Sequence, residues 1–137
     1  MADETLDLTP LRRAIERLDE GWQRYQQDTS DTQIRDGLIQ RFEFTYEISH
    51  KMLKRHLEAT SANPSELDGI SFADLIRSGS ERGLLLSDWP HWRRFRDMRA
   101  KTSHTYDEAV ALEVVDSIPD FQREANHLLE RLQDAQA

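Results

Sequence analysis

The sequence predicts an all-α protein, an up-and-down four-helix bundle with an additional short helix. Apolar residues recur every three or four positions in four long segments, as they do on the buried face of a helix. No segment shows the apolar–polar alternation that is typical of a half-buried strand. Glycine and proline, which interrupt helices, are scarce at 5 and 4 of 137 residues. We therefore expect a single helical domain over residues 1–137.

The first two helices are predicted from their start signals and apolar stripes. Thr9 is a candidate N-cap, and Pro10 suits the first helical position. A polar break at residues 28–31 separates this helix from a long one over about residues 32–60. The long helix has a wide apolar arc, so we expect it to contact several neighbours. Its polar face includes Glu43 and Glu47, which we expect to be solvated.

The remaining elements follow from turn and cap residues. Residues 61–71 form a loop, and Ser71 caps a short helix. A further helix is predicted over about residues 87–101. Thr105–Glu108 fits a capping box, in which the threonine and the glutamate bond free amides at the start of the last helix. Pro119 should kink that last helix.

Composition excludes several classes of protein. The chain has no cysteine, which excludes disulfides and cysteine-ligated zinc and fits a reducing cytoplasm. The start of the chain, Met1–Thr5, lacks the apolar run of a signal peptide, and no apolar stretch approaches the roughly 20 residues that span a bilayer. We therefore expect a cytoplasmic protein that does not enter a membrane. The net charge of −8 means that any RNA contact depends on a local basic patch.

Two kinds of site are suggested by short patterns and rejected. Glu47-x-x-His50 and Glu124-x-x-His127 have the spacing of di-iron bundle ligands, but on a helical wheel they lie outside the apolar stripes. We interpret these side chains as solvated and expect no metal or other cofactor. Nucleotidyl transfer by this chain would need a Gly-Ser loop beside a sheet and paired carboxylates for Mg²⁺, but Gly79-Ser80 is followed by a lone Asp88 and no sheet is predicted.

The segment from Arg93 to Tyr106 holds the strongest candidate site. A helix stop near residue 102 and a restart near residue 105 would place Arg99 and His104 in one corner. Histidine can move a proton at a ribose 2′-OH or at a leaving oxygen near neutral pH, and arginine can stabilise charge on the phosphorus centre. The alternative is that Arg99 pairs with an acid and His104 caps a helix end. The further basic side chains of this segment are candidate RNA contacts: Arg93, Arg94, Arg96 and Lys101.

Three stretches carry a resemblance to a known family. They are Arg99-x4-His104-x-Tyr106, the run Gln40–Glu47 with Lys51–Lys54 after it, and the run Ser103–Glu108. The first resembles the Arg-x4–6-His-x-Tyr motif of HEPN proteins. The others are similar to the branch named nucleotidyltransferase substrate-binding proteins. The resemblance runs from about Leu11 to Leu132.

The resemblance implies a function. HEPN members of this kind are helical homodimers paired with a minimal nucleotidyltransferase (MNT) as a toxin–antitoxin system. The HEPN protein is a metal-independent endoribonuclease, with Arg99 and His104 as its implied catalytic pair here. The partner inactivates it by transferring AMP to the motif tyrosine, Tyr106. This chain has Ala100 where the family often has asparagine, and the older family name leaves an alternative role as a non-catalytic substrate-binding subunit.

Overall fold

The structure is a computed structural model that describes residues 5–137, so most of the acidic start of the chain, Met1–Glu4, lies outside the described residues. Its helices are α1 (Thr9–Gln27), α2 (Thr32–Ala59), α3 (Phe72–Glu81), α4 (Trp89–Lys101) and α5 (Glu108–Gln136). Two short 3₁₀ helices, η1 (Pro64–Leu67) and η2 (Thr102–His104), precede α3 and α5 respectively. The described residues contain no strand.

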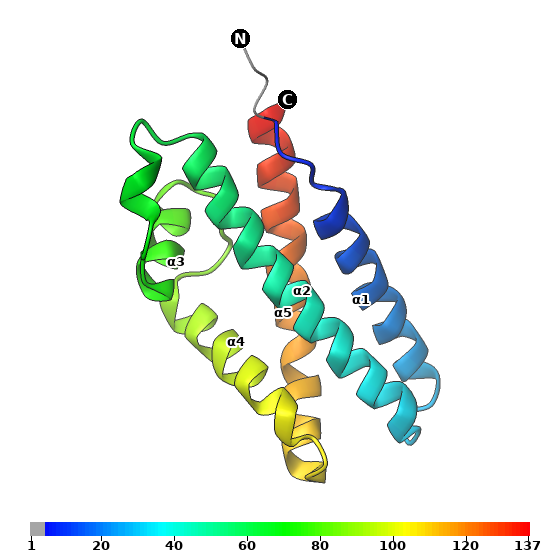
Figure 1. Cartoon of the computed structure of the whole chain (residues 1–137). Coiled ribbons are helices and arrows are strands. Elements are labelled where there is room, and N and C mark those ends of the chain that lie inside the picture. The colour runs from blue at the N-terminus through cyan, green and yellow to red at the C-terminus, as the bar shows by residue number, and fades with distance from the viewer. Residues whose placement is uncertain (1–4) are drawn as a thin grey trace.

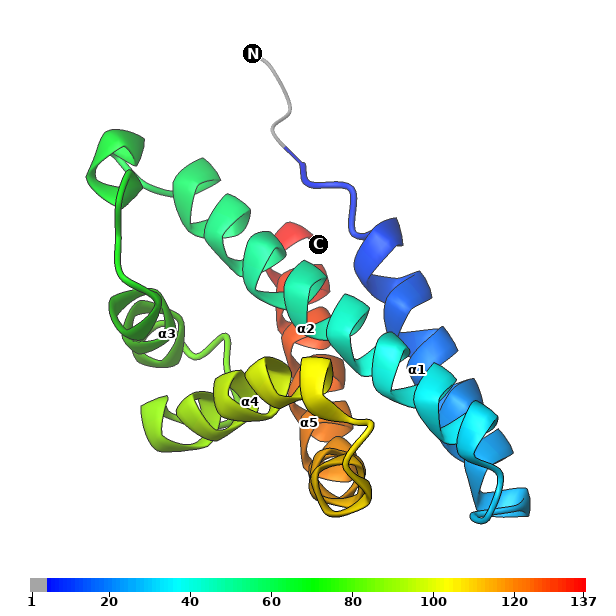
Figure 2. The same ribbon diagram turned by 60° about the horizontal axis from the view of Figure 1, so that its bottom comes forward.

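The four long helices run up and down, as predicted. In Figure 1, α1 descends, α2 returns beside it, α4 descends on the other side of α2, and α5 rises behind them. Figure 2 gives the same order, with α1 on one side of α2 and α3 and α4 on the other. Because α2 contacts α1, α3, α4 and α5, it is the central helix that its wide apolar arc indicated. The all-α bundle with an additional short helix is confirmed.

An aromatic cluster forms the middle of the core. Phe42 of α2, Trp92 and Phe95 of α4 and Phe121 of α5 are all at most 2% exposed. Their rings meet edge to face, with 5.2 Å between the centroids of Phe42 and Phe121 and 5.5 Å between those of Trp92 and Phe95. Such pairs add about 0.5–1.5 kcal/mol each beyond the burial of apolar area. The cluster therefore fixes α4 against α2 and α5, the three helices that carry the candidate site.

Helix starts agree only partly with the sequence. Ser71 caps α3 as predicted, since its side chain accepts a hydrogen bond from the Asp74 amide at 3.1 Å. Thr9, however, lies within α1, whose N-cap is Leu8 without a capping side chain. The prediction for α5 was also wrong, because Asp107 and not Thr105 is its N-cap. The Asp107 carboxylate accepts from the amides of residues 109 and 110 at 2.9 and 3.3 Å.

A buried carboxylate ties α5 to the segment between α3 and α4. Glu124 was expected in solvent, but it is 0% exposed, and its Oε2 accepts hydrogen bonds from the Leu86 and Ser87 amides at 2.8 and 3.4 Å. These amides precede α4 and have no helical partner of their own, so they supply the donors that Oε2 of the buried carboxylate requires. Among the described helices, none is long and apolar enough to cross a membrane.

Candidate active site between α4 and α5

The chain turns sharply between α4 and α5, in residues 99–106, which we call the corner. At the end of α4, the Arg99 carbonyl accepts hydrogen bonds from the Thr102 amide and from the Thr102 hydroxyl, the latter at 2.7 Å. The single turn of η2 follows and brings His104 to its last position. Tyr106 lies in the turn before α5 and does not open the helix as expected, because α5 begins at Glu108.

His104 and Tyr106 both lie on the surface of the corner. Tyr106 is 89% exposed, and the His104 side chain is exposed as well. Their ring centroids are 6.4 Å apart at an interplanar angle of 75°. Within residues 5–137 the imidazole of His104 has no hydrogen-bond partner, so it does not cap the helix end through its side chain. Its two nitrogens are therefore open to a ligand from solvent.

Arg99 is held by side chains from α2. Its Nε lies 3.1 Å from Oε1 of Glu47, and its Nη1 lies 3.5 Å from Oε2 of Glu43. Nη1 also donates to the Thr102 hydroxyl at 3.2 Å. The Arg99 side chain remains 32% exposed. The expectation that Glu43 and Glu47 are solvated was wrong. The alternative that Arg99 pairs with an acid is confirmed.

Glu47 also contacts a histidine. Its second oxygen, Oε2, lies 3.3 Å from Nε2 of His50, whose ring packs edge-on against Tyr46 and Phe72. Burial lowers the pKa of His50 below its usual value, even though the Glu47 carboxylate acts in the opposite direction. Burial likewise raises the pKa of Tyr46, whose phenol therefore stays protonated. One carboxylate thus holds the Arg99 cation and a neutral imidazole together.

The basic residues of α4 do not form the single patch that the sequence suggested. Arg94 pairs with Asp120 at 3.4 Å, and Lys101 pairs with Glu113 at 2.8 Å, so both turn toward α5. Arg96 turns the other way, with its guanidinium 5.5 Å from the centroid of the Trp89 ring. Arg93 is exposed and has no ion pair among the described residues. A helix of 100° per residue separates consecutive positions onto different faces, which divides the cluster.

The side chains that orient Arg99, Glu43 and Glu47, were not predicted from the sequence. Glu43 and Glu47 are one helical turn apart on α2, so they share a face, but no basic residue on the same helix pairs with both. Two acids at this spacing are a weak signal for a cation from another helix. Neither this cluster nor any other in residues 5–137 brings together three or more histidine, aspartate or glutamate side chains that could hold a metal ion.

Comparison with known proteins assigns the chain to a family. Residues 6–134 match the family described as nucleotidyltransferase substrate binding protein like. The chain is 44% identical over 96 residues to a Haemophilus influenzae protein named probable ribonuclease HepT, an alignment that covers 70% of this chain and 65% of that protein's length.

Two solved structures share the fold. HI0074 of Haemophilus influenzae, described as the fold of a substrate binding domain of a nucleotidyltransferase, is 34% identical with a TM-score of 0.86, over 93% of this chain and 99% of that one. A crystallised protein of Thermus thermophilus is 33% identical with a TM-score of 0.72, over 89% and 98%. The chain therefore belongs to the nucleotidyltransferase substrate binding branch of the HEPN family.

Proposed function

We propose that this protein is a metal-independent endoribonuclease toxin whose catalytic residues are Arg99 and His104. The observation that carries the proposal is the corner itself, where an exposed imidazole without a hydrogen-bond partner follows an arginine fixed by two carboxylates. The relative named as a ribonuclease supports the same activity. General acid–base catalysis needs a titratable group that a substrate proton can reach, and His104 is such a group.

The chemistry is an internal transfer at phosphorus. Neutral His104 accepts the proton of a ribose 2′-OH, the 2′-oxygen bonds to the adjacent phosphorus, and the bond from phosphorus to the 5′-oxygen breaks. The 5′-oxygen takes a proton from the protonated His104 of the second copy in a homodimer. Arg99 stabilises the negative charge that grows on the phosphoryl oxygens. The products are a 2′,3′-cyclic phosphate and a free 5′-hydroxyl, and no step requires a metal ion.

Tyr106 is the regulatory position in this proposal. A minimal nucleotidyltransferase partner joins the Tyr106 hydroxyl to the α-phosphorus of ATP and releases pyrophosphate. Of the three tyrosines, Tyr25 and Tyr46 are 5% and 4% exposed, whereas Tyr106 is 89% exposed and accessible to such an enzyme. The added AMP brings bulk and negative charge to the corner that holds Arg99, and so competes with an RNA phosphate.

Expression in a bacterial host tests the proposal. The wild-type chain alone should slow growth, and His104→Ala should relieve the effect at equal protein levels. Co-expression with the nucleotidyltransferase should restore growth and add the mass of one AMP to the intact chain. Tyr106→Phe should keep its unmodified mass, while Tyr25→Phe, a buried control, should still be modified. An unmodified wild-type chain that leaves growth unaffected would contradict the proposal.

A second candidate function is a non-catalytic subunit that binds a substrate for the nucleotidyltransferase. The ion pairs of Arg99 with Glu43 and Glu47 favour it, because they satisfy the guanidinium within the chain. Ala100, in place of the asparagine frequent in the family, points the same way. This function predicts a stable complex with the nucleotidyltransferase and no RNA turnover. Arg99→Gln would then change the partner's activity and leave RNA intact.

A further inference from the structure

Part of the unpaired positive charge of this acidic protein lies on α1, away from the corner. Arg94, Arg99 and Lys101 are neutralised by carboxylates of α2 and α5. On α1, in contrast, Arg13 and Arg17 are exposed and make no ion pair with any described residue. They are one helical turn apart, so their side chains extend from the same face of the helix. The chain as a whole has a net charge of −8, so two arginines without ion pairs on one face form a local positive region.

These arginines line a groove between α1 and α2. The groove has a volume of about 400 Å³, and no acidic residue lines it. Its other lining residues on α2 include Gln40, Arg41 and Phe44, and Phe44 is 59% exposed. Arg41 is fixed in place, since its Nη1 donates to the Arg17 carbonyl at 2.8 Å. We call this set of side chains, Arg13, Arg17, Gln40, Arg41 and Phe44, the α1–α2 groove.

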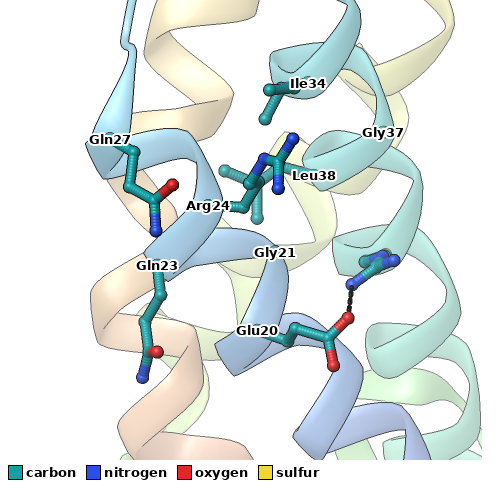
Figure 3. A pocket seen from close by; sticks show the side chains of 9 residues that line it. Glu20, Gly21, Gln23, Arg24, Gln27, Ile34, Gly37 and Leu38 are labelled. Carbon is teal, nitrogen blue, oxygen red and sulfur yellow. Dashed lines mark hydrogen bonds and ion pairs between the residues drawn. The ribbon is translucent and has the colours of Figure 1, made fainter.

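A second hollow between α1 and α2 adjoins the groove and marks one of its ends. Figure 3 shows this hollow farther along the same two helices, where Arg24 extends from α1 toward α2 and Glu20 reaches an arginine of α2. That arginine is Arg41, 3.5 Å from the Glu20 carboxylate. The two hollows share Gly37 and Arg41. Acid therefore borders the groove on this side, and the part of the groove without an ion pair is the stretch beside Arg13, Arg17 and Phe44.

The chemistry of the groove fits single-stranded nucleic acid better than a protein helix. A docked helix needs a stripe of apolar contacts, but Phe44 is the one large apolar side chain among these lining residues. Proteins that hold single strands combine a positive groove for phosphates with an exposed aromatic face on which a base stacks. Arg13 and Arg17 supply the first feature, and Phe44 supplies the second.

The groove and the corner lie on opposite flanks of one helix. Phe44 follows directly after Glu43, whose carboxylate pairs with Arg99, while Arg41 and Thr45 on the other flank bond to carbonyls of α1. In both ribbon views α2 runs between α1 and α4. A strand that lies in the groove therefore needs to cross only the width of α2 to reach Arg99 and His104.

We propose that the α1–α2 groove binds a single-stranded segment of RNA next to the segment that is cut at the corner, with phosphates on Arg13 and Arg17 and a base on Phe44. The inference rests on the proposed ribonuclease function for its substrate. It concerns binding, however, and can be tested without cleavage. It also moves the expected RNA contacts from the α4 basic residues to α1 and α2.

The test measures binding of a fluorescein-labelled, 2′-O-methylated oligouridine of 12 nucleotides, which lacks the 2′-OH that cleavage needs. The full-length wild-type protein, shown by intact mass to be unmodified, is titrated at several salt concentrations by fluorescence anisotropy. The double variant Arg13→Gln/Arg17→Gln should bind at least about tenfold more weakly, and the slope of log affinity against log salt should fall by about 1.4 for two lost phosphate contacts. Phe44→Ala should weaken binding about five- to tenfold or more.

Two further variants separate a groove from general charge. Arg12→Gln/Arg55→Gln removes the same two charges from exposed positions on α1 and α2 outside the groove, and should bind within about twofold of wild type. Gly37→Leu fills the groove without changing charge, because a side chain at Gly37 starts in open space, and it should weaken binding about as much as Phe44→Ala. Circular dichroism and a thermal unfolding curve check that each variant folds.

The outcomes either support or overturn the inference. Selective weakening by the groove variants supports it, even if wild type and His104→Ala fail equally to cut natural RNA, in which case only the ribonuclease function fails. Equal weakening by the groove and control pairs overturns it, because charge alone would then explain binding. RNA binding unchanged in the groove variants, with loss of co-purification with the nucleotidyltransferase, also overturns it and makes the groove a protein-docking surface.

Discussion

At the residue scale, Glu47 holds two groups at once, with one oxygen on the Nε of Arg99 and the other on the Nε2 of His50. An arginine that must meet a phosphate gains from being fixed beforehand, since misplacement by about 1 Å can cost as much as 100-fold in rate. The ion pair itself adds little to stability, about 1 kcal/mol or less, because both side chains are about a third exposed. The ion pair therefore mainly fixes the orientation of the Arg99 guanidinium, and Glu47 is a positioning residue for Arg99.

Glu47→Gln should lower the kcat of RNA cleavage about tenfold and leave KM unchanged or lower. The amide keeps the size of the side chain but loses the charge that fixes the guanidinium, while Arg99 becomes less neutralised and binds phosphate no worse. Steady-state kinetics on a fluorescent RNA measures both constants. Asp97→Asn, which removes an exposed charge two residues from Arg99, should change kcat less than twofold. Equal effects of the two variants would show that net charge, not orientation, is responsible.

The half-buried His50 predicts a pH dependence of stability. Burial keeps its folded-state pKa below the usual 6.5, so the unfolded chain takes up a proton first as the pH falls. Stability from this group is therefore intact above about pH 6.5 and is lost as the pH drops below that value toward the folded pKa. His50→Gln, which does not titrate, should lose less unfolding free energy than wild type between about pH 7.5 and 5.5 in urea titrations.

Burial also lowers the pKa of His56. Wild type and His50→Gln both keep His56, so both should lose some unfolding free energy as the pH falls. The prediction concerns only the difference between them. Identical pH profiles for wild type and His50→Gln would show that His50 is protonated as easily in the folded chain as in the unfolded one.

At the element scale, the start of α5 decides how the corner is closed. Asp107 accepts two amide hydrogen bonds there, and Glu108 reaches Arg35 of α2 at 2.7 Å. This pair joins the beginnings of α2 and α5, and Arg35 is only 6% exposed. The turn that carries Tyr106 is therefore anchored at its end by a cap and by an ion pair.

Asp107→Ala should lower the free energy of unfolding by about 1 kcal/mol, the usual effect of removing an N-cap side chain. Thr105→Ala should lower it by less than half as much, because within residues 5–137 the Thr105 hydroxyl makes one hydrogen bond, to the Thr102 carbonyl at 3.4 Å. Urea unfolding followed by circular dichroism compares the two variants directly. A larger loss for Thr105→Ala would restore the capping box that the sequence suggested.

Local patterns sufficed for the helices but not for their ends or their ion pairs. Periodicity placed α2 within one residue of its bounds, since its apolar face repeats along a helix of 28 residues. The capping box failed because Glu108 pairs with Arg35, which is 73 residues away in the chain. Glu124 was misjudged for the same reason, because its partners are amides 37 and 38 residues before it. Contacts of this range are set by packing and are not visible in local spacing.

The candidate site shows the same division. The motif residues Arg99, His104 and Tyr106 could be chosen from the sequence because they match the motif of HEPN proteins, and the predicted helix break near Thr102 made a shared corner for Arg99 and His104 possible. Their surroundings could not be chosen, since Glu43 and Glu47 belong to a helix about 52 residues earlier. The division of the basic residues onto two sides of α4 was available from a helical wheel, but their acidic partners on α5 were not.

At the scale of the whole molecule, ion pairs are distributed unevenly over the surface. The carboxylates of α2 and α5 neutralise most of the cations of α4, while Arg13 and Arg17 of the α1–α2 groove have no ion pair among the described residues. The acidic chain as a whole repels RNA, so binding depends on these local regions and should weaken steeply with salt. The corner lies where α2, α4 and η2 meet. Residues that are far apart in the sequence are close together there.

The most direct test of the central claim is RNA cleavage by the purified protein in excess chelator, with wild type beside His104→Ala. Intact mass must first show that Tyr106 carries no AMP, and product ends are analysed by mass spectrometry. We expect cleavage by wild type with 2′,3′-cyclic phosphate ends, and a loss of at least about 100-fold in His104→Ala, the scale of general acid–base catalysis. No cleavage of varied RNAs by the unmodified wild-type protein, or equal cleavage by both proteins, would contradict it.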